Sequence, residues 1–269
     1  MATHLHVCTP RDGWNWLMQG VALFRKRPAD LFIFGNTYLF VILFVGILIP
    51  FLGAALVTLL TPAMAYGINL AGKMANSGLR ITPATLFAGL GPDNRRYLNK
   101  LMMLGVAYTA GFAVAKLIAH LVMGPQPDID LANLRNLPPE QLAQVTEFMM
   151  QSAALTILTT IPVILAFWYA PVLVVWHDMQ PGQAIFSSWV AVWRNKGAFV
   201  IYGMGWLLLS SMLSGLIVGV FSLLGLPAAL LGALNIMTLA LIMAISLATV
   251  YFSYTAVFEH TDELAITGD

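Results

Sequence analysis

The chain has 269 residues, of which 59% are apolar and only 9% are charged. Soluble domains carry about 25% charged residues, so a chain this poor in charge cannot cover a water-facing surface and must be surrounded mainly by lipid. The net charge of +1 argues against a nucleic-acid-binding protein, and the single cysteine excludes a disulfide within the chain.

The N-terminal region combines a short tail with a stretch that has the pattern of a membrane-surface helix. The residues before Pro10, including Cys8, are expected to form an ordinary tail. Apolar side chains such as Trp14, Leu17 and Met18 then recur at helical spacing, and a run of three basic residues follows. A helix with an apolar face and basic flanks lies in the plane of the membrane interface.

Six apolar segments are long enough to cross a membrane, which requires about 20 residues for a hydrocarbon core of about 30 Å. They are expected at 31–49, 54–73, 101–123, 153–176, 198–222 and 229–257. The first pair and the last pair each lie in a charge-free stretch that is broken by a short turn containing proline. The sequence therefore predicts an all-α integral membrane protein with six transmembrane helices in a single domain.

Basic residues predict the orientation of these helices, because lysine and arginine accumulate on the cytoplasmic side. With an even number of spans both termini share one side. Of the 13 basic residues, only Lys116 and Arg135 fall on the other side. We therefore expect a bacterial inner-membrane protein whose N-terminus and C-terminus both lie in the cytoplasm.

Two further segments, which begin near Pro83 and Pro181, repeat the pattern of the first surface helix before the third and fifth spans. Tryptophan prefers the headgroup level, and basic side chains meet anionic lipid there. The expected membrane-interface anchors are Trp14, Trp16, Arg25, Lys26, Arg27, Arg95, Arg96, Trp189, Trp193, Arg194 and Lys196. Together the three helices are expected to form a collar at the inner leaflet.

The order of interfacial helix, outward span and inward span recurs three times, which predicts parallel repeats related by an axis along the membrane normal. The repeats are expected at 10–75, 81–178 and 180–260, and a tail occupies 261–269. The inward spans also correspond, because Pro62 aligns with Pro171 and Tyr169 with Tyr251. Repeat two differs by an acidic outer insert at 124–152, which is either a binding face or a spacer and contains a helix beginning near Pro139.

The chain carries none of the HExxH, GxSxG, P-loop or cysteine-cluster motifs that would indicate a metal, acyl-transfer or nucleotide site. We therefore expect no catalysis, no cofactor and no metal. Lys116 and His120 share a helix face near the outer surface. These two residues either form a site for an anionic ligand or, in the simpler interpretation, extend their side chains to the membrane surface.

A second polar cluster falls at the cytoplasmic ends of the fourth and sixth spans. It consists of His177, Asp178, Glu259 and His260. A hydrolase or metal site is conceivable here, and the simpler interpretation is that the histidines stabilise helix C-termini through the helix dipole.

The recurring pattern of an amphipathic "GW…G…LF…P" segment, a span and a "TPxxxG" stretch resembles a family of uncharacterised six-span bacterial inner-membrane proteins. These are akin to the membrane domain of glycerophosphodiester phosphodiesterases. The resemblance covers most of residues 10–260. It implies an all-helical membrane fold, and it carries over no catalytic residue.

These observations together predict a non-catalytic inner-membrane protein that acts by binding. It would be an accessory or assembly subunit of a membrane complex, or a lipid-organising scaffold. The expected partners are membrane lipids, including anionic headgroups, and other integral membrane proteins, with no nucleic acid. The alternative is a transporter or lipid flippase with a cavity on the pseudo-threefold axis, and a membrane hydrolase is a third hypothesis.

Overall fold

The computed structural model describes residues 5–49, 52–124 and 138–258, and within these ranges the chain forms helices and no β-strand. Six helical stretches in these ranges are long and apolar enough to cross a membrane, which confirms the predicted number of spans. The α-helices are α1 (Pro10–Lys26), α2 (Pro28–Leu48), α3 (Leu52–Asn76), α4 (Leu98–Met123), α5 (Pro139–Phe167), α6 (Ala170–Trp176), α7 (Pro181–Arg194), α8 (Lys196–Leu223) and α9 (Ala228–Phe258).

Proline at the first helical position begins several of these elements, because its missing N–H is not needed there and its φ suits a helix. Pro10, Pro28, Pro139 and Pro181 open α1, α2, α5 and α7 in this way. The helix predicted near Pro139 therefore exists, and it runs on without a break as the first part of the fourth span. That span then bends between α5 and α6.

The second interfacial segment differs from the prediction of an amphipathic α-helix. It forms two short 3₁₀-helices, η1 (Pro83–Leu90) and η2 (Pro92–Tyr97), that meet at Gly91. Pro83 opens the first piece, and Pro92 opens the second directly after Gly91, so the two prolines divide the segment into pieces of eight and six residues. The segment is nevertheless anchored, since Leu86 in η1 is fully buried.

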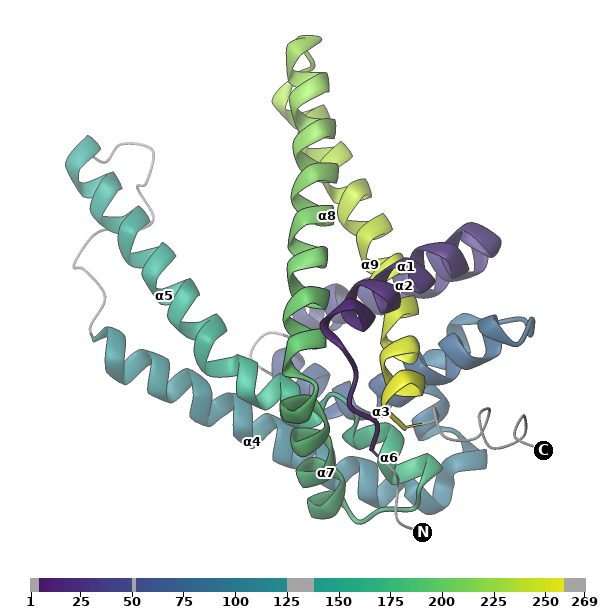
Figure 1. The fold of residues 1–269 in the computed structure, drawn as a ribbon. Helices are drawn as coiled ribbons and strands as arrows, with labels where there is room; N and C mark the ends of the chain where they lie inside the picture. The colour runs from purple at the N-terminus through teal and green to yellow at the C-terminus, as the bar shows by residue number, and fades with distance from the viewer. Residues whose placement is uncertain (1–4, 50–51, 125–137, 259–269) are drawn as a thin grey trace.

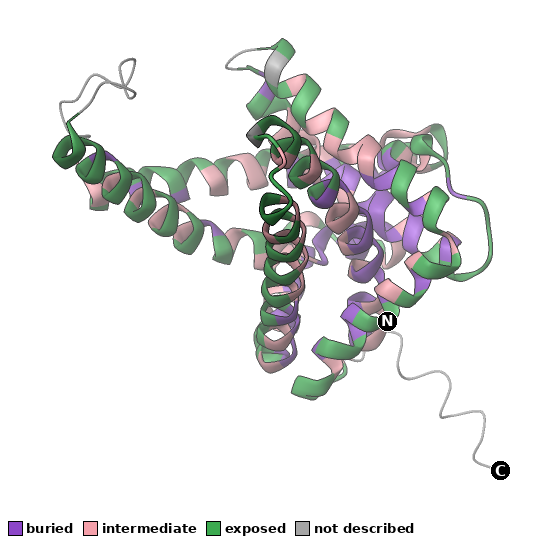
Figure 2. Ribbon diagram, turned by 90° about the horizontal axis from the view of Figure 1, so that it is seen from above, coloured by how far each residue is buried: buried purple, intermediate pink, exposed green. Residues whose placement is uncertain are grey.

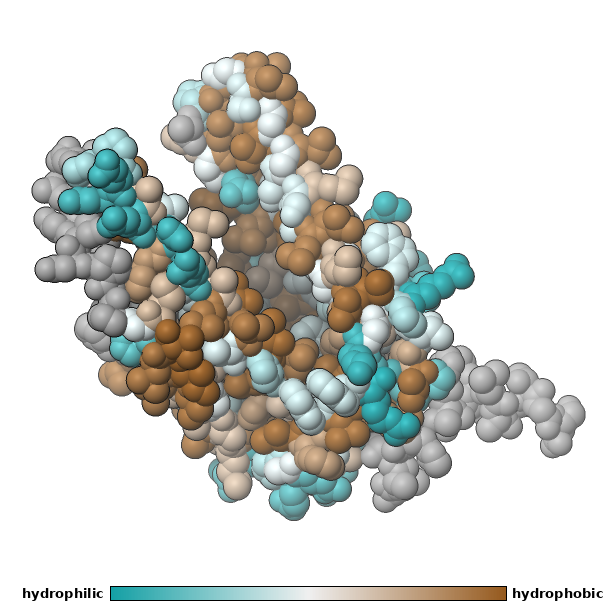
Figure 3. Space-filling view, turned by 60° about the vertical axis from the view of Figure 1, so that its left-hand side comes forward, coloured by the Kyte–Doolittle hydropathy of each residue, from teal (hydrophilic) through white to brown (hydrophobic). Residues whose placement is uncertain are grey.

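The packed core lies at one end of the molecule, which we call the base: the end where α3, α6 and α9 finish and where α1, η1 and α7 lie (Figure 1). Buried residues concentrate there, as Figure 2 shows. Away from the base, the α4–α5 hairpin diverges from α8 and α9. The surface is hollowed between the two hairpins, with apolar residues around the hollow (Figure 3). We call the opposite end, where the hairpins turn, the far end.

The first interfacial helix is held to the base by close contacts at two glycines. A Cβ atom added at Gly13 would lie 1.9 Å from the Ala198 carbonyl oxygen, and one added at Gly20 would lie 2.1 Å from a methyl group of Thr249. Glycine is therefore required at both points. Between them, Trp16 is only 1% exposed and packs edge-on against aromatic rings of α8.

Replacing Gly13 with alanine is expected to lower the free energy of unfolding by about 1–3 kcal/mol, because the added methyl group overlaps the α8 backbone. Thermal unfolding of the purified protein in detergent measures this. The matched control is Gly203→Ala in α8, where a Cβ would meet nothing within 4 Å and the better helix propensity of alanine stabilises. Equal unfolding temperatures for the two variants would show that the close contact is not important.

Candidate lipid groove and polar pockets

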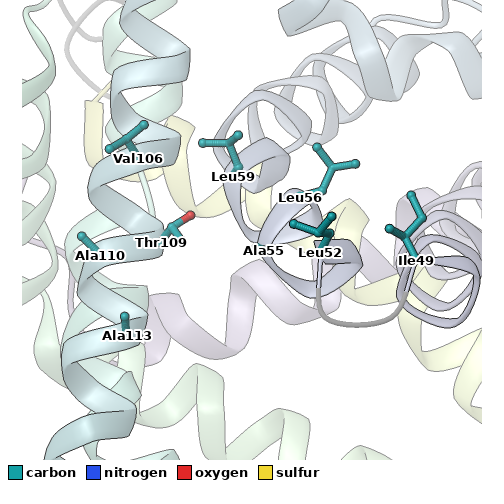
Figure 4. A pocket seen from close by; sticks show the side chains of 9 residues that line it. All are labelled: Ile49, Leu52, Ala55, Leu56, Leu59, Val106, Thr109, Ala110 and Ala113. Carbon is teal, nitrogen blue, oxygen red and sulfur yellow. The ribbon is translucent and has the colours of Figure 1, made fainter.

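A groove of about 700 Å³ lies between the far half of α3 and the middle of α4 (Figure 4). It is lined by Ile49, Leu52, Ala55, Leu56, Leu59, Val106, Thr109, Ala110 and Ala113. The one polar side chain among them, Thr109, donates its hydroxyl to the Gly105 carbonyl oxygen at 2.9 Å. Because that hydroxyl is already satisfied, the groove offers only apolar contact.

The shape of the groove follows from side-chain size along the two helices. Near the base, Gly105 brings α4 against the backbone of α3 at Leu59, where a Cβ would lie 2.0 Å from the carbonyl oxygen. Beyond that contact the helices separate, and the small side chains of Ala110 and Ala113 leave the space open. Leu52 on the opposite wall is 71% exposed, so the groove faces the surroundings of the protein.

A smaller cavity of about 140 Å³ lies where α3, α4, α5, α6 and α9 meet. It is lined by both aligned prolines, Pro62 and Pro171, and by the side chain of Asn69. Asn69 is 1% exposed, and its amide nitrogen donates to the Ala65 carbonyl oxygen at 2.9 Å. Its Oδ1 atom is buried and has no hydrogen-bond partner among the described residues. The cavity therefore presents one unsatisfied acceptor, surrounded mainly by apolar and aromatic side chains.

The two residues predicted as an anionic-ligand site, Lys116 and His120, line one cavity of about 220 Å³ at the far end. The opposite wall belongs to α5 and includes Phe148, Ser152 and Thr156. No acidic residue is among the described residues that line this cavity. The antiparallel packing of α4 and α5 thus adds two hydroxyl groups that sequence patterns did not connect with Lys116.

One curated relative shows how the chain is related to known proteins. It is a probable inner membrane protein of Burkholderia thailandensis, 34% identical over 202 residues, and the match covers 74% of each chain. The chain belongs to the same family as this protein. No protein-family model and no solved structure matches the chain. Together with six apolar helices of sufficient length, the relationship establishes a multi-pass inner-membrane protein.

The predicted interface anchors of this membrane protein divide into exposed and buried residues. Trp14 and Trp193 are 47% and 59% exposed, Trp193 stacks on Trp189, and the Lys196 ammonium lies over the Trp193 ring. Trp16 is a core residue and not an anchor, because the two glycine contacts turn its face of α1 inward. Arg25, Lys26, Arg95, Arg96 and Arg194 are exposed.

Arg27 has a structural role besides any contact with lipid. Its guanidinium donates to the Leu79 carbonyl oxygen at 2.8 Å and to the Gly78 carbonyl oxygen, and it pairs with Asp30 at 3.4 Å. These bonds fasten the junction between α1 and α2 to the loop that follows α3. Such a role could not be recognised in a run of three basic residues.

The predicted cluster at the ends of α6 and α9 is only partly described, because Glu259 and His260 lie outside the described residues. His177 places Nε2 at 2.7 Å from the Tyr254 hydroxyl, and burial lowers the pKa of its imidazole. Asp178 accepts a hydrogen bond from Lys100 at 2.7 Å, which lowers the pKa of its carboxyl group. The two neighbours therefore face different helices and tie the turn after α6 to α9 and to α4.

The N-terminal residues that the structure describes are docked, although a simple tail was expected. Asn195 is 1% exposed, accepts a hydrogen bond from the Cys8 backbone at 2.6 Å and donates to the His6 carbonyl oxygen at 3.2 Å. Burial, with a smaller contribution from Asp12, raises the pKa of the Cys8 thiol to about 11. The thiol is therefore protonated near neutral pH. A lone asparagine between two helices gives no sequence signal for this contact.

Proposed function

We propose that the protein is a non-catalytic inner-membrane scaffold that holds membrane lipid against its transmembrane helices. The groove between α3 and α4 is the observation that carries this proposal. Its volume of about 700 Å³ lies within the range of 300–1,000 Å³ typical of ligand sites, and its lining offers no free polar group. A hydrocarbon chain of a lipid matches these properties.

The interfacial helices support the same proposal. The exposed tryptophans Trp14 and Trp193 and the exposed basic residues beside them lie at the base, where they would contact headgroups. The pairing of His177 with Tyr254 and of Asp178 with Lys100 favours structural roles for these polar residues over hydrolysis. An accessory role toward other membrane proteins and the relation to phosphodiesterase membrane domains stay predictions.

We also propose that the chain consists of the three parallel repeats 10–75, 81–178 and 180–260. Each interfacial segment packs on the inward span of the preceding repeat, since η1 contacts α3 and α7 contacts α5 and α6. The first segment, α1, contacts α9 of the last repeat, as a cyclic arrangement requires. The second repeat diverges most, because it contains the insert at 124–152 and its interfacial segment forms the 3₁₀-helices η1 and η2.

In the proposed orientation the base faces the cytoplasm, because the basic residues of α1, η2, α7 and α8 lie there. A reporter that is active only in the cytoplasm is expected to be active when fused after Asp269. A reporter that is active only outside the cytoplasm serves as the matched fusion. Activity of the second reporter alone would show that the orientation is inverted.

Filling the groove tests the lipid-scaffold proposal. Ala113→Trp is expected to lower the phospholipid retained on the purified protein by about tenfold, the change that corresponds to 1.4 kcal/mol of lost contact. Native mass spectrometry counts the retained lipids. The matched control is Val114→Trp, at a position 56% exposed and outside the groove, which should retain lipid as the wild type does.

Two outcomes would contradict this proposal. One is equal lipid retention in the Ala113→Trp and Val114→Trp variants. The other is the loss of a co-purifying membrane protein from Ala113→Trp with lipid retention unchanged, which would identify a partner helix as the occupant of the groove.

A transporter is the second candidate, and the unsatisfied Oδ1 atom of Asn69 favours it. A buried acceptor without a partner costs about 1–3 kcal/mol, unless a bound molecule supplies a donor. The cavity lies where all three inward spans converge, so it occupies the proposed pseudo-threefold axis. Its aromatic wall and single acceptor suit a small molecule that donates a hydrogen bond.

A thermal-shift panel of small alcohols, amides and amines tests this second candidate. A ligand of the cavity is expected to raise the unfolding temperature of the wild type and not that of Asn69→Leu, which lacks the acceptor. Asn36→Leu is the matched control, because Asn36 makes the same type of bond to the carbonyl four residues earlier, outside the cavity. If no compound distinguishes Asn69→Leu from Asn36→Leu, the transporter candidate fails.

A further inference from the structure

We infer that the far-end cavity around Lys116 and His120 binds the phosphate of an anionic phospholipid whose acyl chain lies in the α3–α4 groove. The inference rests on the proposed lipid-holding function and adds a headgroup class to it. Four features of the described residues carry it: the helix face that the two sites share, the charge, the free hydroxyl groups and the apolar surroundings.

Successive turns of α4 line the groove and then the cavity. Thr109 and Ala113 line the groove, and Lys116 and His120 line the cavity. Their spacing of four, three and four residues places all four side chains on one face of the helix. Lys116 lies about 4.5 Å further along the axis than Ala113, at 1.5 Å of rise per residue. A chain that fills the groove therefore ends beside the ammonium group.

The charge at this end of the molecule favours an anion. Lys116 lies about 27 Å along α4 from its first residue, Leu98, which places it near the far membrane surface. Of the lysines and arginines that the structure describes, the others lie at the base. The described ion pairs are Arg27–Asp30 and Lys100–Asp178, so no described carboxylate neutralises Lys116.

Two hydroxyl groups in the cavity are available to donate to a phosphate. On α5, Thr146, Thr159 and Thr160 donate their hydroxyls to carbonyl oxygens of their own helix. Ser152 and Thr156 line the cavity, and no hydrogen bond among the described residues uses their hydroxyls as donors. A charged acceptor opposite Lys116 would accept bonds from both.

The surroundings favour a lipid as the source of the phosphate. Leu117 and Leu121, on the same turns of α4 as the two basic residues, are 55% and 70% exposed. Exposed leucines beside the cavity indicate that hydrocarbon reaches this level of the protein, since exposed apolar patches mark membrane contact. The phosphate of a lipid can enter such a site from the side, within the membrane. A free phosphate ion would first have to leave water.

The experiment compares phosphatidylglycerol with phosphatidylcholine of the same acyl chains, bound to the full-length protein and counted by native mass spectrometry. The wild type is expected to prefer phosphatidylglycerol. Lys116→Ala should reduce that preference about tenfold, the effect of losing one charge-assisted contact, and Lys116→Arg should retain it. Thr156→Val should weaken phosphatidylglycerol binding, and the matched Thr146→Val, whose hydroxyl is already bonded to its own helix, should not.

The outcomes separate this inference from the proposed function. If Ala113→Trp lowers the binding of both lipids while Lys116→Ala leaves the preference unchanged, the groove holds lipid and the headgroup inference is wrong. If Ala113→Trp has no effect on either lipid, both are wrong. If inorganic phosphate binds the wild type but not Lys116→Ala, and no lipid preference is seen, the cavity is a site for free phosphate and the inference is also wrong.

Discussion

The packing of α1 across the start of α8 and the end of α9 is the contact on which the rest of the structure depends. Gly13 lets α1 approach the backbone of α8, Gly20 lets it approach the Thr249 methyl group of α9, and Trp16 is buried between these contacts. Because α1 also precedes α2 directly, this contact joins the beginning of the chain to its last hairpin. The base thereby becomes one packed unit, whereas the hairpins beyond it are free to diverge.

That division between base and far end explains where binding can occur. In lipid, a helix satisfies its own backbone hydrogen bonds, so a hairpin needs no neighbour along its whole length. The α4–α5 hairpin and α8 consequently expose apolar side chains that a soluble protein would bury. Lipid covers such faces, and the groove between α3 and α4 opens beyond the point where Gly105 brings α4 against the backbone of α3.

The roles of several residues depend on how the helices pack against one another. Trp16 and Trp14 belong to the same short motif, but only their positions around α1 decide that one is buried and the other exposed. Lys116 and His120 were recognised from their spacing, whereas Ser152 and Thr156 joined them only through packing of α5. Asn69 lies in an apolar span, and its unpaired Oδ1 atom can be recognised only in the folded cavity.

The amino-acid sequence by itself determined that lipid surrounds the protein, how many spans it has and that the fold is helical. It did so because the lengths of apolar segments, the charges and the prolines act locally along the chain. It also indicated the interfacial segments, since amphipathic spacing is a property of one helix. The tertiary structure decided which face of each helix turns inward, where the helices separate and which polar groups remain unpaired. Those properties depend on contacts between residues far apart in the chain, such as Gly13 with Ala198, and no local pattern records them.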